Sequence, residues 1–478
     1  MKNRKELPRG VQRSRKERAP EAQWMTDAEI AAAMPYEDGS ILLGKHDGHA
    51  VGVKDDRHLL TVAGSRAGKS STCLKPNLLR WPSSVLCIDP KGELAKESAE
   101  RRAAMGQDVF ILDPFGEVDG PAARFRVGFN PLSEILAGDP RDIIDNASQI
   151  ADALIVPNKG DSVDHWSLSA KNLLRGLILY ALASGQKADL TATLPVVRQM
   201  VTAPLGDREN WSEDDEEIWL STLFKIMSRM DDFDGVIAGV GGTMDGKPDG
   251  ERGSIISTAV EQTAFLDSTS MQEHLASDGL PSLRQLKQKP TTIYLVLPAS
   301  RMATHFRWLR VILTLALSAL EREPMRLEHP VLFVLEEFPQ LGYMRQIEAA
   351  AGLMAGYHCK LWTILQDLSQ IRALYRDSWE TFIGNAGVVQ AFGNTDATTL
   401  DYISRKLGTR SIVETRDNHP TASNVSAGGS ATSQNRTTVP LLAPFEVALY
   451  GARDTGMQFV MMAGEPPAYI DRLSHEEV

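Results

Sequence analysis

The 478-residue sequence predicts an α/β protein, in which a doubly wound sheet is interrupted by an inserted all-α domain. Three observations support this fold class. Short, continuously apolar runs alternate with helical patterns near both ends of the chain. A glycine-rich phosphate-binding sequence directly follows the first of these runs. Between residues 139 and 283, apolar residues recur at helical spacing instead, and no strong strand pattern interrupts them.

The apolar runs are typical of parallel strands that are covered by helices on both faces. We expect strands at Leu59–Ala63, Val85–Asp89, Val109–Asp113, Thr291–Leu297, Val331–Leu335, Leu361–Leu365 and Val388–Phe392. The helical patterns in the gaps between these runs complete the doubly wound arrangement.

The changes between strand and helix patterns along the sequence predict the domain boundaries. The sheet domain is expected in two parts, residues 41–138 and 284–478, around an all-α domain at 139–283. Residues 1–40 form a basic arm that we expect to be flexible, with a short helix between Met25 and Pro35. The arm is either disordered or a tether to nucleic acid or an anionic membrane surface. Residues 418–438 are rich in Ser, Thr, Asn and Gly, which predicts a mobile loop.

The composition excludes several classes of protein. With 42% hydrophobic and 24% charged residues, the chain is neither fibrous nor wholly disordered. Cys73, Cys87 and Cys359 are too few and too far apart for a disulfide framework or a zinc ribbon, so we expect a reducing, cytoplasmic location. A net charge of −11 argues against a general nucleic-acid coat, but it leaves a local DNA-contacting loop or pore open. No apolar run reaches the ~20 residues that a spanning helix needs.

The stretch from Ala63 to Ser70 reads AGSRAGKS and is expected to form a P-loop. Glycines let such a loop fold its N–H groups around phosphates, Lys69 reaches the β- and γ-phosphates, and the Ser70 hydroxyl binds Mg²⁺. The usual leading glycine is replaced by Ala63, and Gly64 follows one place later. The expected nucleotide-binding residues are Gly64, Ser65, Arg66, Ala67, Gly68, Lys69, Ser70 and Ser71.

Two acidic residues follow the apolar run Val331–Leu335, at the end of the strand where ligands bind in open α/β sheets. Glu336 is expected to hold Mg²⁺ together with Ser70, although an Asp is commoner at that position. Glu337 is expected to polarise the attacking water. The alternative is a strand that ends in a solvated acidic turn.

Two further strand ends carry candidate residues. Asp89 competes as the metal carboxylate, but Glu336 and Glu337 rank above it for metal and water; a supporting role and a capping role for Asp89 both stay open. Gln366 is placed to hydrogen-bond the γ-phosphate or the attacking water, or else caps its strand. An arginine finger is also expected, but spacing does not choose between Arg372, Arg376, Arg405 and Arg410.

Together these stretches resemble the VirD4/TraG family of coupling ATPases of conjugation and type IV secretion. The matching residues are 58–63 leading into the P-loop, Asp89–Glu93, Asp113–Phe115, Asn130–Leu132, Glu336–Phe338, Gln366–Gln370 and Pro440–Leu442. The resemblance covers most of Ile41 to Arg472. It implies a RecA-like P-loop NTPase that uses ATP and Mg²⁺ and works as a homo-hexamer with ATP between subunits. It also implies single-stranded DNA or a relaxase-type protein as substrate, and a secretion-channel or membrane-anchor protein as partner.

The sequence differs from the family pattern at two points. Family members carry transmembrane helices ahead of the P-loop, whereas this sequence has no such span there, so we expect a soluble branch or a peripheral protein held at the inner membrane by a partner. Glu336 stands where the family has Asp. Two alternatives therefore stay open. One is a DNA translocase related to FtsK and HerA, although no winged-helix module follows the motor. The other is an ATP-binding substrate adaptor with little turnover.

Overall fold

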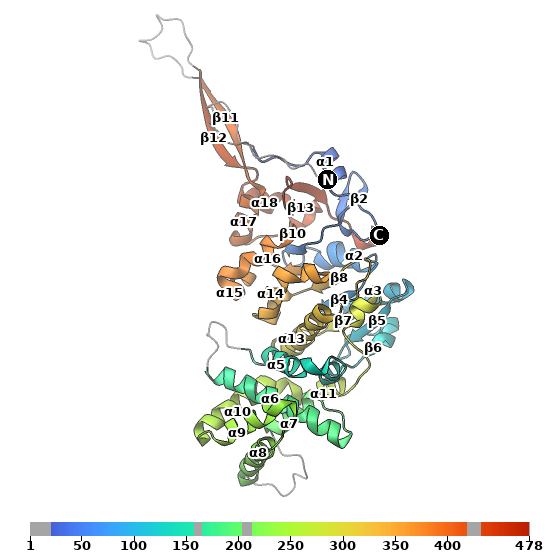
Figure 1. The fold of residues 1–478 in the computed structure, drawn as a ribbon. Helices are drawn as coiled ribbons and strands as arrows, with labels where there is room; N and C mark the ends of the chain where they lie inside the picture. Colours follow the sequence, from blue (N-terminus) through green and yellow to red (C-terminus); the bar gives the residue numbers. More distant parts are fainter. Residues whose placement is uncertain (1–20, 157–164, 203–212, 418–431, 478) are drawn as a thin grey trace, which may run out of the picture.

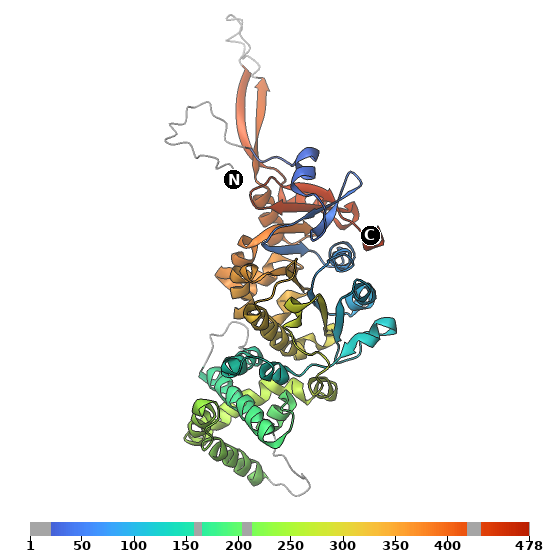
Figure 2. The ribbon, with the colours of Figure 1, turned by 45° about the vertical axis from the view of Figure 1, so that its right-hand side comes forward.

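The computed structural model describes residues 21–156, 165–202, 213–417 and 432–477. The chain forms an elongated body with the helical insertion at one end and a projecting β-hairpin at the other (Figure 1). The sheet that carries the P-loop lies between them, and both views of the ribbon place it there (Figure 2).

The main sheet has twelve strands in the order β2-β1-β14-β13-β10-β3-β9-β8-β4-β7-β5-β6. Pairing is parallel from β10 to β6 and antiparallel from β2 to β10. The strands are β1 (Ile41–His46), β2 (His49–Val53), β3 (His58–Ala63), β4 (Val85–Asp89), β5 (Asp108–Leu112), β6 (Arg126–Val127), β7 (Thr291–Val296), β8 (Val331–Leu335), β9 (Cys359–Leu365), β10 (Ala386–Phe392), β13 (Met457–Met462) and β14 (Ala468–Asp471). All seven predicted strands are present, with ends shifted by at most two residues.

Helices cover both faces of this sheet, as the doubly wound prediction requires. One face packs on α1 (Asp27–Ala33), the helix Ser70–Leu74 (η1), α2 (Lys75–Leu78) and α3 (Glu93–Ala104). The other packs on α13 (Ala299–Arg322), α14 (Arg345–Leu353), α15 (Leu368–Tyr375), α16 (Glu380–Gly384) and α17 (Ala397–Leu407). Side chains alternate along each strand, so Leu59 joins the first core whereas Leu60 joins the second. Two apolar cores therefore hold the sheet from opposite sides.

The remaining short helices connect these layers. They are α4 (Pro131–Leu136), α12 (Gln285–Gln288) and α18 (Pro444–Tyr450). In the described part of 139–283 every regular element is helical: α5 (Ile143–Leu154), α6 (His165–Ala188), α7 (Leu194–Thr202), α8 (Glu213–Met227), α9 (Val236–Asp245), α10 (Asp249–Thr263) and α11 (Thr269–Leu275), with short 3₁₀ turns between them. A Cβ at Gly176 of α6 would lie 2.5 Å from Val240 of α9, so the glycine permits a close crossing there. The division of the chain into domains at 41, 139 and 284 stays a prediction.

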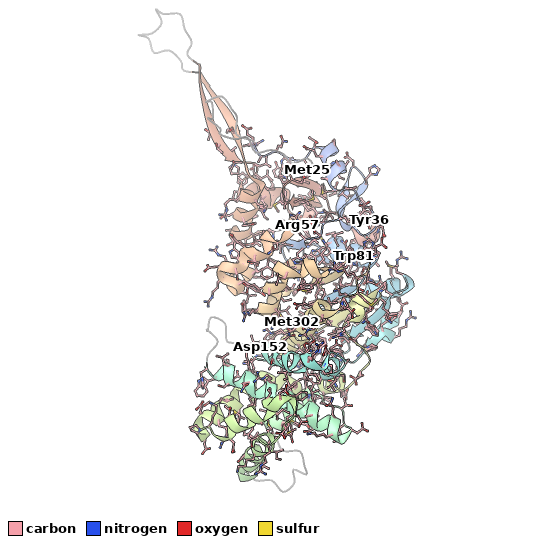
Figure 3. The ribbon with its side chains drawn as sticks, in the orientation of Figure 1. Met25, Tyr36, Arg57, Trp81, Asp152 and Met302 are labelled. Atoms are coloured by element: carbon pink, nitrogen blue, oxygen red, sulfur yellow. The ribbon has the colours of Figure 1, made fainter. Side chains whose placement is uncertain are left out.

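Two expectations need correction. The expected flexible arm includes residues 1–20, which lie outside the described residues, but Glu21–Ser40 are folded against the body. The predicted short helix is present as α1, Thr26 caps it with a capping box, and Met34 is fully buried. Met25, also buried, lies near the base of the hairpin in Figure 3. The arm is held because these apolar side chains enter the core.

The expected mobile loop at 418–438 is also partly wrong. Residues 418–431 lie outside the described residues, but β12 (Thr432–Pro440) pairs antiparallel with β11 (Thr409–Asp417) in a separate two-stranded sheet. Polar strands of this kind lack the apolar alternation that would have indicated them from sequence. Within the described residues, no helix is long and apolar enough to cross a membrane.

Candidate active site

The P-loop connects β3 to η1 at the carboxyl edge of the sheet. Its backbone is left-handed at Arg66 (φ 57°) and Gly68 (φ 95°), which curls the loop back on itself. A Cβ at Gly64 would lie 1.9 Å from the Gly393 carbonyl oxygen, so only glycine fits where the loop meets the turn after β10. The Gly64 N–H also donates to the Phe392 carbonyl at 3.2 Å. The loop is thus held in shape by the neighbouring strand.

Lys69 and Ser70 each face one of the two carboxylates that follow β8. Lys69 is buried, and its Nζ lies 3.7 Å from Oε1 of Glu337. The Ser70 hydroxyl donates to Oε1 of Glu336 at 3.1 Å. The two carboxylates therefore diverge, one toward Lys69 and the other toward the Ser70 hydroxyl.

The backbone at Glu337 explains this divergence. Glu337 has φ 53° and ψ 34°, a left-handed conformation that is costly for a residue with a side chain and is concentrated at functional sites. It ends the strand abruptly and starts the short 3₁₀ helix η7 (Phe338–Leu341). A strained backbone thus places the second carboxylate opposite Lys69.

Gln366 completes the group of predicted catalytic residues. Its side-chain amide donates to both carboxylate oxygens of Glu337, at 3.0 and 3.1 Å. This contact follows from strand order, because β9, which ends just before Gln366, pairs with β3 on one side and with β8 on the other. The structure therefore brings Lys69, Ser70, Glu336, Glu337 and Gln366 together at one edge of the sheet.

The electrostatics of the site suit a divalent cation. Burial, with Asp89 nearby, raises the pKa of Glu336 to about 7, and burial raises the pKa of Asp89 to about 6. The raised pKa values indicate that too little positive charge lies near these two carboxyl groups to stabilise their ionised forms. A divalent cation that prefers oxygen ligands would supply that charge. Ser70 Oγ and Glu336 supply oxygen donors side by side, so the residues present fit Mg²⁺.

Asp89 itself is a capping residue. Its carboxylate accepts hydrogen bonds from the backbone N–H of Lys91 at 3.4 Å and of Ala95 at 2.8 Å. It thereby closes the turn that leads into α3. The geometry favours the capping alternative over direct metal binding.

Three of the four candidate finger arginines make no bond to the P-loop within the described part of the chain. Among the described residues, no hydrogen bond or ion pair joins Arg372, Arg405 or Arg410 to that loop. Arg405 instead donates to the Asp401 carbonyl, and Arg410 lines a separate aromatic pocket with Trp24 and Tyr469. Arg376 sits at the C-terminal end of α15 with φ 46°.

Sequence reasoning missed a contact between the C-terminal tail and the P-loop. The Arg472 guanidinium donates to the carbonyls of Ala67 and Arg453 and lies 4.9 Å from the centre of the Phe392 ring. His475 Nδ1 lies 3.3 Å from the carbonyl oxygen of Ser71. No motif marks these residues, because their partners lie about 400 positions earlier in the chain.

The winding of η1 explains why the Ser71 carbonyl needs such a partner. Lys75 N–H bonds to the Ser70 carbonyl, five residues back, so this turn is wider than an α-helix. In that register the carbonyl of Ser71 would face residue 76, which is a proline without an N–H. The tail thus contacts a carbonyl that the helix leaves unpaired.

Comparison with known proteins places the chain in a family. A sequence model of the family described as type IV secretory system conjugative DNA transfer matches residues 17–475. The conjugal transfer protein TraG of Escherichia coli is 27% identical over 458 residues, covering 91% of this chain and 67% of TraG. VirD4 of Agrobacterium fabrum is 26% identical over 430 residues, covering 87% of this chain and 58% of VirD4. The chain thus spans between 58% and 67% of the length of these relatives.

Solved structures support the fold. The conjugative coupling protein TrwB, in a trigonal form with sulphate, superposes with a TM-score of 0.67 at 15% identity, covering 96% of this chain and 94% of TrwB. A TrwB complex with the ATP analogue ADPNP gives a TM-score of 0.65 at 16% identity, covering 96% and 94%. The similarity confirms the expected RecA-like α/β fold. Because the family model matches nearly the whole chain, this protein belongs to the type IV secretory system conjugative DNA transfer family.

Proposed function

We propose that this protein is an ATP-hydrolysing coupling protein that recruits or translocates DNA, or a relaxase–DNA nucleoprotein, to a type IV secretion channel. The observation that carries the proposal is the contact of Glu337 with Gln366 on one side and its approach to Lys69 on the other. The buried Lys69 is suited to bind phosphates. Glu337, whose carboxylate is held by the amide of Gln366, is suited to orient the attacking water.

Each residue has a separate task in this mechanism. The P-loop amides and Lys69 bind and orient the phosphate chain, and Lys69 exchanges its contact with Glu337 for the γ-phosphate. Glu337 then accepts a hydrogen bond from the attacking water, while Gln366 fixes the orientation of that carboxylate. Ser70 and Glu336 would hold Mg²⁺, which when bound would neutralise the developing charge on the phosphates.

The relatives support the coupling role and the cofactors. The names of the TraG relatives include conjugal transfer, and TrwB has been solved with ADPNP and with ADP and Mg²⁺. We therefore assign ATP and Mg²⁺ to this site and conjugative DNA transfer to this chain. Single-stranded DNA, or a relaxase-type protein, is the proposed cargo.

We further propose that the active form is a homo-hexamer with ATP between neighbouring subunits. In support, no arginine among Arg372, Arg405 and Arg410 contacts the P-loop of its own chain in the described structure. A finger supplied by the neighbouring subunit would complete the site. We also propose a channel or anchor protein that holds this chain at the inner membrane.

The experiment is an ATPase assay with and without single-stranded DNA, combined with mass measurement in the presence of nucleotide. We expect DNA-stimulated hydrolysis and a ring mass. Lys69→Ala should lose nucleotide binding, whereas Glu337→Gln should bind nucleotide without turning it over. The matched control is Glu465→Gln, a substitution at an exposed glutamate in the turn after β13. Hydrolysis retained by both site variants would overturn the proposal. Nucleotide binding without turnover in the wild type would favour the adaptor alternative.

A further inference from the structure

A buried arginine of α13 links the helical insertion to the catalytic edge of the sheet. Arg310 is only 5% exposed, yet its guanidinium donates solely to backbone carbonyls: Ala153 at 3.0 Å, Leu341 at 2.8 Å and Tyr343 at 2.7 Å. Among the described residues, no Asp or Glu forms an ion pair with it. Burying a guanidinium without a carboxylate is costly, because its charge loses its hydration. The contacts themselves therefore indicate what this arginine does.

On one side, Arg310 holds the end of α5, the first helix of the insertion. Ala153 and Leu154 carry the last carbonyls of that helix, which have no partner within it. Arg307, one turn earlier on α13, donates to the Leu154 carbonyl at 3.0 Å and to Oε1 of Gln262 at 2.6 Å. Figure 3 labels Asp152 of α5 and Met302 of α13 where the two helices come together.

On the other side, Arg310 holds the segment that begins at the catalytic glutamate. Leu341 is the last residue of η7, which starts directly after Glu337. The Gln340 N–H donates to the Glu337 carbonyl at 2.9 Å, so a single helical turn separates the arginine-bound carbonyls from the catalytic residue. Arg310 thus reaches the Glu337 turn without contacting the P-loop.

An aromatic cluster also packs against η7. Phe338, next to Glu337, lies with its ring centre 5.9 Å from Tyr375 and 5.4 Å from Phe382. The Tyr375 hydroxyl accepts a hydrogen bond from the Met344 N–H at 3.3 Å. Because Tyr375 ends α15, the helix that follows Gln366, the cluster also joins the segments behind the two catalytic side chains. Arg310 is the contact that ties this unit to the insertion.

We infer that Arg310 is a positioning residue for ATP hydrolysis, which fixes the Glu337 turn against the end of α5 and so makes water attack depend on the arrangement of the helical insertion. The inference rests on the proposed function of the site. It names the contact through which cargo bound on the insertion would change turnover. Since Arg310 does not touch the nucleotide-binding loop, its loss should lower kcat and leave the KM for ATP unchanged.

The test is steady-state ATPase kinetics of the full chain carrying Arg310→Lys. Lysine keeps the positive charge, but its single ammonium group cannot replace the guanidinium, which bonds at once to the end of α5 and to the segment after η7. We expect kcat to fall about tenfold or more, with KM for ATP within about twofold of the wild type. The control Arg307→Lys alters the contact with α5 and not the one with η7, so basal kcat should change less than about twofold. An unchanged kcat in Arg310→Lys, or a loss confined to KM, would overturn the inference.

Hydrogen–deuterium exchange of the wild type provides a second readout, which needs nucleotide binding but neither turnover nor a stable variant. Adding ADPNP should change exchange at 338–344 and at 151–156 together, in addition to protecting the P-loop. Protection of the P-loop alone would contradict the inference. Wild-type protein without ATPase activity would instead contradict the proposed function, so the two failures are distinguishable.

Discussion

The amide of Gln366 donates to both carboxylate oxygens of Glu337, 29 residues earlier in the chain. A single nitrogen, Nε2 of Gln366, reaches both oxygens, so the contact restrains the orientation of the carboxylate. Glu337 also lies beside Lys69, so the carboxylate is held between an amide and a cation.

Substitutions of Glu337 and of Gln366, the two partners of this contact, should lower kcat by different amounts. Glu337→Gln should lower kcat by about 10²–10⁴-fold, because the water loses its acceptor. Gln366→Ala should cost only about tenfold, since it frees the carboxylate without removing it. Gln366→Glu should be worse than Gln366→Ala, because it places a like charge against Glu337. Single-turnover hydrolysis rates measure all three, and equal rates for the two Gln366 variants would contradict the positioning role.

The Ser70–Glu336 pair predicts a specific metal phenotype. Glu336→Gln should raise the Mg²⁺ concentration needed for half-maximal ATPase activity by about tenfold or more, because a carboxylate ligand is replaced by a neutral amide. Nucleotide binding without Mg²⁺ should be unchanged. A Mg²⁺ titration of hydrolysis is the measurement, with Glu465→Gln as control. An unaltered Mg²⁺ dependence would show that Glu336 is not a metal ligand.

The tail contact predicts a binding phenotype at the P-loop. Arg472→Ala should raise the KM for ATP about tenfold, because hydrogen bonds from a charged group are each worth about 1.5–3 kcal/mol. The kcat should stay within about twofold, since the tail does not reach Glu337. Arg453→Ala is the matched control, because only the backbone carbonyl of that exposed arginine is used. A loss of kcat with an unchanged KM would refute this role.

Replacing glycine by alanine should have opposite effects on stability at Gly64 and at Gly253. Gly64→Ala should lower the free energy of unfolding by about 2–3 kcal/mol and abolish nucleotide binding, because its Cβ would collide with the Gly393 carbonyl. Gly253 lies exposed within α10, where a Cβ meets nothing within 4 Å. Gly253→Ala should therefore stabilise the protein by about 0.5–1 kcal/mol. Chemical denaturation of both variants checks the pair, and a tolerated Gly64→Ala would contradict the close approach.

Histidine burial predicts a loss of stability in acid. Burial lowers the pKa of His58, at the start of β3, to about 4, and that of His274 likewise. Between pH 6.5 and 4 the unfolded chain binds protons that the folded chain excludes, so stability is full above pH 6.5 and falls as the pH drops. Each histidine contributes about 2–3 kcal/mol to this loss.

A single substitution isolates the contribution of His58. Its Nδ1 accepts from the Leu361 N–H, so its Nε2 carries the hydrogen that faces the Ala350 carbonyl. His58→Gln can preserve both bonds and should flatten the dependence of unfolding free energy on pH between 6.5 and 4. His49→Gln, at an exposed position, should not. Parallel pH profiles for His58→Gln and the wild type would refute the assignment.

Much of the fold could be predicted because its signals are local. A short apolar run such as Val331–Leu335, set among helical patterns, predicts a buried strand, and a glycine-rich loop before a helix predicts a phosphate site. The polar hairpin β11–β12 has no such signal, which is why part of it was predicted as a loop. The packing of Met34 was likewise hidden, because a short helix does not reveal which core it will join.

The candidate site divides in the same way. Residue type and position along the chain are enough to predict Glu336, Glu337 and Gln366 at strand ends and Lys69 in the P-loop. That β9 lies between β3 and β8, which puts Gln366 against Glu337, is visible only in the folded chain. The same is true of the contact of Arg472 with the P-loop and of the link that Arg310 makes between α5 and η7. The order of parallel strands and the docking of distant segments depend on the packing of crossover helices, which no local pattern of residues encodes.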